Sequence, residues 1–231
     1  MFMFIDPLYL VMILPALALA IYAQVKVKRT VKRYSAVGSM SGMTGASAAR
    51  RILDGFGLND VPVEQAGGWL SDHYDPGKRV LRLSPEIHST ASVAAVGIAA
   101  HEAGHALQHA QGYAPLKLRN AIVPTASIGS WLAFPMIIVG FIFQLQSLAL
   151  AGLVLFGALV LFQIITLPVE LDASARAKKL ISELGIVYAG EEREGVAKVL
   201  NAAAMTYVAA TVTAIVQLLY FALSLGILGD D

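Results

Sequence analysis

Residues 148–167, LALAGLVLFGALVLFQIITL, decide the fold class because they contain no Lys, Arg, Asp or Glu. A helix needs about 20 predominantly apolar residues to cross a bilayer, so this stretch predicts a membrane span. The stretches 7–25, 122–143 and 207–228 are also apolar and uncharged. The chain is 57% hydrophobic and 14% charged, whereas soluble domains are nearer half apolar and a quarter charged. These features predict a mainly α-helical membrane protein with about four transmembrane helices.

The positive charges predict the orientation of these spans. All 17 Lys and Arg residues lie in segments 26–121 and 168–206. Four spans place these two segments on one side, and an excess of Lys and Arg marks the cytoplasmic side. The first span lacks the positive region that precedes the apolar core of a cleavable signal. We therefore expect a multi-pass cell-membrane protein with both termini outside.

The first polar segment has local patterns of its own. Residues 41–58 have the apolar spacing of an amphipathic helix. The stretch WLSDHYDPGKRVLRLS, 69–84, predicts a β-hairpin whose turn is Asp75-Pro76-Gly77. Ser84-Pro85 is a typical helix start, and the helix that follows is expected to end at Gly112.

A metal-binding motif lies in that last helix, within GIAAHEAGHALQ, residues 97–108. His101 and His105 are four residues apart, so their imidazoles lie on one helix face and can bind one zinc ion. Glu102 lies beside them as a candidate general base. We expect Gly104 to keep the helix surface slim for a substrate. The chain has no cysteine, so any metal must be held by His, Asp or Glu.

A catalytic zinc ion needs a third protein ligand. His109 is two helical turns, about 12 Å, from His101 and cannot reach the same ion. Glu170 is the better candidate, because it follows the third span on the side of the motif. We expect Pro168 to begin a helix there, and Glu170 could instead be a carboxylate favoured by the start of that helix.

Asp172 is a candidate to orient one of the imidazoles, because metal-bound histidines usually donate their second N–H to a carboxylate. An alternative is an ion pair between Asp172 and Arg176, one helical turn later.

The chain resembles the YugP-type neutral zinc membrane metallopeptidases over nearly its whole length. The resemblance is carried by the stretches SGMTGASAARRILD, DHYDPGKRVLRLS, VAAVGIAAHEAGHALQ, LPVELDASARA and VLNAAAMTYVAA. The family is similar in its logic to HtpX-like membrane proteases, which are gluzincins. In those proteins the third ligand is a glutamate followed four residues later by an aspartate. Here that later position is Ser174.

The resemblance implies a zinc-dependent endopeptidase with one Zn²⁺ per chain. We expect His101, His105 and Glu170 to hold the metal and Glu102 to act as general base toward a zinc-activated water. The oxyanion of the reaction needs a further donor. Candidates are Tyr207, His73, Tyr74 and Tyr188. The substrate is expected to be a peptide or membrane protein, with membrane-protein quality control as one hypothesis for its role.

Two other functions remain open. One is a site-2-type intramembrane protease, although the ILDGFG stretch, with Asp54, precedes the histidines instead of following them. The other is a non-enzymatic metal-binding membrane scaffold, which would not need Glu102. Nucleic acid is not an expected partner, because the basic cluster at 26–33 adjoins a span and suits anionic headgroups. Oligomeric state cannot be predicted.

The expected organisation alternates spans with polar segments. The cytoplasmic portion should be a zincin-like α+β catalytic part that contains the small β-hairpin. In chain order we expect span 1 (1–25), the catalytic segment with the HExxH helix (26–121), spans 2 and 3 (122–167), the segment with the third ligand (168–206), and span 4 with a short tail (207–231).

Overall fold

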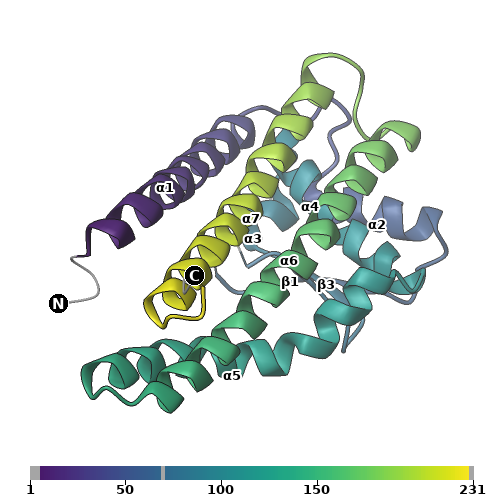
Figure 1. The fold of residues 1–231 in the computed structure, drawn as a ribbon. Helices are drawn as coiled ribbons and strands as arrows, with labels where there is room; N and C mark the ends of the chain where they lie inside the picture. The colour runs from purple at the N-terminus through teal and green to yellow at the C-terminus, as the bar shows by residue number, and fades with distance from the viewer. Residues whose placement is uncertain (1–5, 69–70, 229–231) are drawn as a thin grey trace. The chain divides into compact units, whose positions relative to one another are not determined.

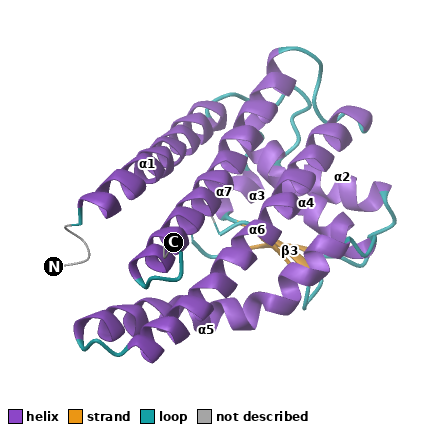
Figure 2. Cartoon of the chain, viewed as in Figure 1, coloured by secondary structure: helices purple, strands orange, loops and turns teal. Residues whose placement is uncertain are grey.

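The computed structural model describes residues 6–68 and 71–228 and is built mainly from helices, with one small sheet (Figure 2). Four of its helices are long and apolar enough to cross a membrane, as the apolar stretches predict. The predictions for the chain termini, and residues 69–70 of the predicted hairpin, fall outside the described residues. In chain order the elements are α1 (Pro7–Ser35), α2 (Gly45–Gly55), β1 (Val63–Gln65), β2 (His73–Asp75), β3 (Val80–Leu83), α3 (Pro85–Ser89), α4 (Val93–Ala110), α5 (Ala114–Ile142), α6 (Gln146–Glu183) and α7 (Glu191–Ser224) (Figure 1).

The helices extend well beyond the apolar stretches. Helix α6 continues through Pro168, so the prediction that this proline begins a new helix was wrong. An interior proline removes one backbone hydrogen bond, but membrane helices tolerate the loss when neighbouring groups satisfy the freed carbonyl. Glu170 therefore lies in the interior of a helix instead of in a first turn.

The chain forms two compact units, and the long helices α1, α5, α6 and α7 each contribute residues to both. The first unit contains Met1–Ala23, Lys117–Pro168 and Thr206–Asp231. Its core is an apolar and aromatic cluster that includes Phe156 and Phe221. A Cβ added at Gly152 would lie 2.9 Å from the Ala133 carbonyl oxygen. This glycine allows α5 and α6 to approach closely, as small residues do in membrane helix pairs.

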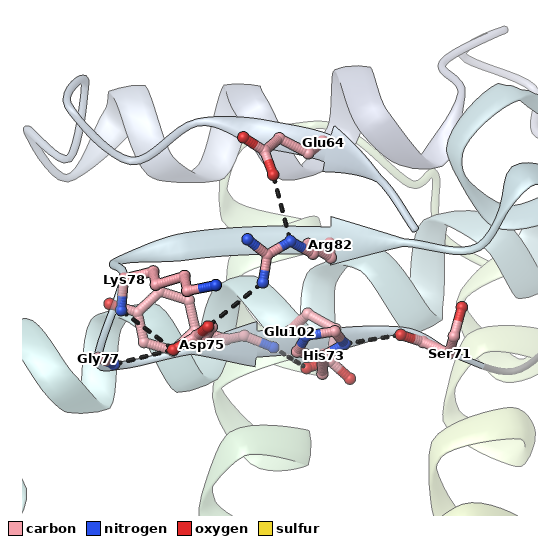
Figure 3. Close-up of polar contacts among 9 residues, drawn as sticks. Glu64, Ser71, His73, Asp75, Gly77, Lys78, Arg82 and Glu102 are labelled. Atoms are coloured by element: carbon pink, nitrogen blue, oxygen red, sulfur yellow. Dashed lines mark hydrogen bonds and ion pairs between the residues drawn. The ribbon is translucent and has the colours of Figure 1, made fainter. Parts of the chain in front are cut away.

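The second unit contains Gln24–Leu116 and Val169–Met205. Its sheet has β3 in the centre, β1 parallel to it on one side and β2 antiparallel on the other. The turn between β2 and β3 is closed by Asp75, whose Oδ1 accepts hydrogen bonds from the backbone N–H groups of Gly77 and Lys78. Arg82 on β3 contacts Asp75 on β2 and Glu64 on β1 (Figure 3). The predicted hairpin thus supplies two strands of a three-stranded sheet.

Helices cover this sheet and build the core of the second unit. Helix α2 buries Ile52 and Leu53, the face that its apolar spacing predicts. The helix expected after Ser84-Pro85 is divided into the short α3 and the longer α4, whose start is capped by the Ser92 side chain. Most of α4 is buried, so its alanine- and glycine-rich sequence serves close packing.

Candidate metal centre

Helix α4 supplies three of the predicted site residues, and two glycines set its distance from neighbouring helices. An added Cβ at Gly97 would lie 3.0 Å from Cγ1 of Val196 on α7. At Gly104 it would lie 2.8 Å from the backbone oxygen of Ala173 on α6. Gly104 is therefore covered by α6. The prediction that it keeps the helix surface open to a substrate was wrong. Its role is to let α6 approach α4.

This close approach brings three candidate ligands together. His101 Nε2 lies 3.2 Å from Glu170 Oε2, and His105 Nε2 lies 3.5 Å from the same oxygen. The donor atoms of all three residues lie within 4.8 Å of one another. Glu170 and His105 are buried, and His101 is mostly so. Two positions on α4 and one on α6, far apart in sequence, thus converge on one point.

The electrostatics of the cluster favour a carboxylate facing the imidazoles. Burial alone would raise the pKa of Glu170, which follows the apolar stretch 148–167, but hydrogen bonds from both histidines hold that pKa well below its usual value. For His105 the effect of burial has the opposite sign, because burial lowers the pKa of an imidazole. Contact with Glu170 and the charge of Glu102 nevertheless leave the pKa of His105 raised overall. The cluster is therefore a place where positive charge is stabilised.

Gln108 determines which nitrogen of His105 faces the cluster. Its Nε2 donates to the Val169 carbonyl oxygen and to Asp172 Oδ2, both at 2.8 Å. Its Oε1 lies 2.9 Å from His105 Nδ1 and can only accept, so Nδ1 carries a proton. In the neutral ring, His105 Nε2 then presents a lone pair to a carboxylate oxygen of Glu170. A cation between the two would relieve their repulsion.

The donor set and spacing fit a zinc ion. Two imidazole nitrogens and one carboxylate oxygen are ligands that zinc uses in catalytic sites. Tetrahedral bonds of about 2.1 Å would place neighbouring donors about 3.4 Å apart. The observed separations of 3.2 and 3.5 Å agree with that value. His101, His105 and Glu170 are therefore able to hold the metal.

Glu102 lies beside this cluster and is held by β2. Its Oε2 accepts a hydrogen bond from the backbone N–H of Tyr74 at 3.0 Å (Figure 3). Tyr74 is opposite Leu81 on β3, and the bond to Glu102 occupies its N–H. The glutamate that the motif singles out is therefore positioned by the edge of the sheet.

The candidate oxyanion donors have different surroundings, and Tyr188 is exposed. The Tyr74 hydroxyl lies 2.9 Å from His109 Nδ1. The His73 ring is exposed, and its Nδ1 lies 2.7 Å from the Ser71 carbonyl oxygen. Tyr207 belongs to the first unit, in α7. The hydroxyl of Tyr74 and the ring of His73 thus have partners outside the metal cluster.

Asp172 lies one contact away from the imidazoles. Its Oδ2 accepts from Gln108 and, at 2.5 Å, from Nε of Arg176, the predicted ion pair. Asp172 thus reaches His105 through Gln108. The Nδ1 of His101 lies instead 3.2 Å from Ser174 Oγ.

Gln108 and Ser174 are the contacts that we did not predict. Gln108 is three residues after His105, and Ser174 is four residues after Glu170. Each therefore lies on the ligand face of its helix. This helical spacing was the available signal.

Comparison with known proteins agrees with this chemistry. The family model described as "Putative neutral zinc metallopeptidase" matches residues 9–226, and the chain belongs to that family. It is 47% identical over 214 residues to "Putative membrane protease YugP" of Bacillus subtilis (strain 168), which covers 93% of this chain and 95% of the relative. No solved structure matches the chain.

Proposed function

We propose that this member of the neutral zinc metallopeptidase family is a membrane-embedded, zinc-dependent endopeptidase of the gluzincin type. One zinc ion per chain is held by His101, His105 and Glu170. The observation that carries the proposal is the convergence of these three donor groups within 4.8 Å. The family description and the name of the Bacillus relative support it.

The division of labour follows from the contacts. When bound, zinc would supply a water of pKa near 7 and polarise the scissile carbonyl. Glu102 is the residue that would take a proton from that water and return it to the leaving amine. The Tyr74 N–H holds Oε2 of Glu102, and among the described residues no hydrogen bond is made to Oε1. Oε1 is therefore the oxygen that we assign to proton transfer.

The first test pairs metal content with cleavage. Full-length protein purified in detergent should contain one zinc ion per chain both as wild type and as Glu102→Gln. Casein cleavage and self-cleavage should occur in wild type and be absent from Glu102→Gln. Glu86→Gln, which changes an exposed glutamate on α3, is the matched control and should behave as wild type. Absence of zinc from wild type and variant would overturn the ligand assignment.

The same experiment addresses the two alternatives. Zinc in both proteins without cleavage by wild type, together with full cellular function of Glu102→Gln, would favour the metal-binding scaffold. The aspartate of the ILDGFG stretch, Asp54, forms an ion pair with Arg50 on α2 at 2.8 Å. This contact gives Asp54 a structural partner within its own helix and does not favour a site-2-type role for it.

We also propose that segments 26–121 and 168–206 form a zincin-like catalytic portion on the cytoplasmic face, with both termini outside. The substrate would be a peptide segment of a membrane protein, in keeping with a role in quality control. The absence of native cysteine allows single-cysteine labelling to test the topology. An impermeant maleimide added to intact cells should label Gln144→Cys, in the loop between α5 and α6, and should spare Lys78→Cys. Both native side chains are exposed, and the reverse pattern would contradict the orientation.

A further inference from the structure

A cationic pocket in the second unit has no role in the metal centre. It has a volume of ≈ 430 Å³ and lies between the polar end of α1 and the first half of α7. Four of its side chains are positively charged, and most of the others are polar. The lining residues are Lys26, Arg29, Thr30, Arg33 and Tyr34 on α1, and Lys198, Asn201 and Ala202 on α7.

The lining residues form one stripe on each helix. On α1 they recur at the spacing of a single helix face, and those on α7 do the same. Tyr34 joins the two stripes, because a Cβ at Gly195 of α7 would lie 2.7 Å from the tyrosine ring. Lys28 and Lys32 belong to the same basic segment but do not line the pocket. Only some of the positively charged side chains of that segment therefore line the pocket.

The charges in the pocket are only partly compensated. Lys198 forms an ion pair with Glu194 at 2.9 Å. Arg29 and Arg33 form no ion pair within the described chain, and the Arg33 guanidinium lies 5.6 Å from the Tyr34 ring centroid. Two guanidinium groups gathered at one concave surface favour an anionic ligand. Phosphate suits them, because arginine donates to phosphate in a bidentate geometry.

Neutral donors complete the site. Asn201 Oδ1 accepts a hydrogen bond from Lys178 at 3.1 Å, which leaves its Nδ2 group as a donor for the pocket. Thr30, on α1, lines the opposite wall. Charged and neutral polar residues on two helices thus line one volume, a composition that suits a phosphate ester.

The position of the pocket along α1 identifies the source of the phosphate. The uncharged apolar stretch of α1 ends at residue 25, and the first lining residue is Lys26. The pocket therefore begins where the helix leaves the hydrocarbon, at the depth of lipid headgroups. We propose that this pocket binds the phosphate of an anionic phospholipid headgroup. This inference rests on the membrane spans and does not depend on the peptidase activity.

Lipid binding to full-length protein in detergent tests the proposal. Delipidated protein is titrated with phosphatidylglycerol or phosphatidylcholine, and bound lipid is counted by native mass spectrometry. Arg29→Gln/Arg33→Gln removes two pocket charges, whereas Lys28→Gln/Lys32→Gln removes two charges from the same segment outside it. At moderate ionic strength, which screens diffuse attraction, the pocket variant should bind phosphatidylglycerol about tenfold more weakly than the control variant.

The outcomes distinguish lipid binding in this pocket from diffuse attraction of anionic lipid to the basic segment of α1. Preference of wild type for phosphatidylglycerol over phosphatidylcholine, lost only in the pocket variant, supports the proposal. Equal weakening in both variants, or in neither, overturns it. Inorganic phosphate is titrated in parallel. If it binds as tightly as the lipid and displaces it fully, the site takes a soluble phosphate and the lipid assignment is wrong.

Discussion

Replacing Gln108 by leucine should weaken zinc binding by about 10- to 100-fold, the usual effect of removing a group that orients a metal-bound histidine. The Gln108 side chain is fully buried and makes three hydrogen bonds, to His105, Val169 and Asp172. Leucine fills a similar space but offers His105 no acceptor for its Nδ1–H. The imidazole is then free to rotate or to change tautomer, and its Nε2 lone pair no longer points reliably at the metal. The expected loss corresponds to about 1.4–2.7 kcal/mol.

The assay is a competitive zinc titration against a chromophoric chelator at neutral pH. The matched control is Gln111→Leu, which removes an exposed contact to Arg176 from the end of the same helical region. We expect its zinc affinity to stay within about threefold of wild type, as for most exposed polar contacts. Gln108→Glu, which keeps an acceptor for His105, should recover part of the affinity.

Stability has to be measured in the same samples, because the substitution also leaves buried polar groups without partners. That costs about 1–3 kcal/mol of folding free energy and should lower Tm by a few degrees without loss of helical signal. If folded Gln108→Leu binds zinc as tightly as wild type, the argument that Gln108 fixes the imidazole is refuted. An equal loss of zinc affinity in Gln111→Leu would indicate that the contacts of Arg176, not the hydrogen bond between Gln108 and His105, determine the affinity.

Three further predictions concern the same unit. Gly104→Ala should destabilise the protein by about 1–3 kcal/mol and reduce zinc content, because the new Cβ would meet the Ala173 carbonyl at 2.8 Å. Gly157→Ala on α6, with nothing within 4 Å, should leave thermal unfolding in detergent nearly unchanged. In chelator-treated protein, Glu170 stabilises the fold above its ordinary pKa and loses that effect as pH falls through its lowered pKa. The imidazole of His105 stabilises the fold below its ordinary pKa and loses that effect as pH rises through its raised pKa. The Tm of the chelator-treated protein should therefore be highest at a pH between the lowered pKa of Glu170 and the raised pKa of His105. Glu170→Gln should flatten both the acid and the alkaline side of this plot of Tm against pH. Tyr74→Phe should keep casein cleavage within about threefold of wild type, because the backbone N–H, not the hydroxyl, contacts the proposed base. A much larger loss of casein cleavage would instead favour the Tyr74 hydroxyl as an oxyanion donor.

The features predicted well from sequence are those with a local physical signal. A transmembrane helix is predicted by the length of its apolar stretch, because the thickness of the bilayer sets that length. The pairing of His101 with His105 follows from helix geometry alone. The hairpin turn was predictable because the Asp75 carboxylate bonds to backbone groups two and three residues away. Each of these depends on neighbours in the sequence and on nothing distant.

The features missed depend on packing between distant segments. Nothing near Pro168 shows that α6 continues for 15 residues beyond it, to Glu183, because the polar part of that helix is stabilised by burial of Ala173 and Ala177 in the core of the second unit. Proline rules predict a boundary, and tertiary contacts override them. Gly104 was misjudged for the same reason, since its neighbour is a backbone oxygen on a helix more than 60 residues away.

The contacts around the imidazoles give the centre a distinctive charge balance. In the usual arrangement a carboxylate accepts from a metal-bound histidine and raises its basicity. Here Gln108 and Ser174, both neutral, contact the two imidazoles. The carboxylate that Gln108 contacts, Asp172, is shared with Arg176. Negative charge next to the proposed metal site therefore comes from Glu170 and Glu102. Because the surrounding contacts add no further negative charge, a bound zinc ion would keep more of its power to acidify water, which is the property that a peptidase requires of it.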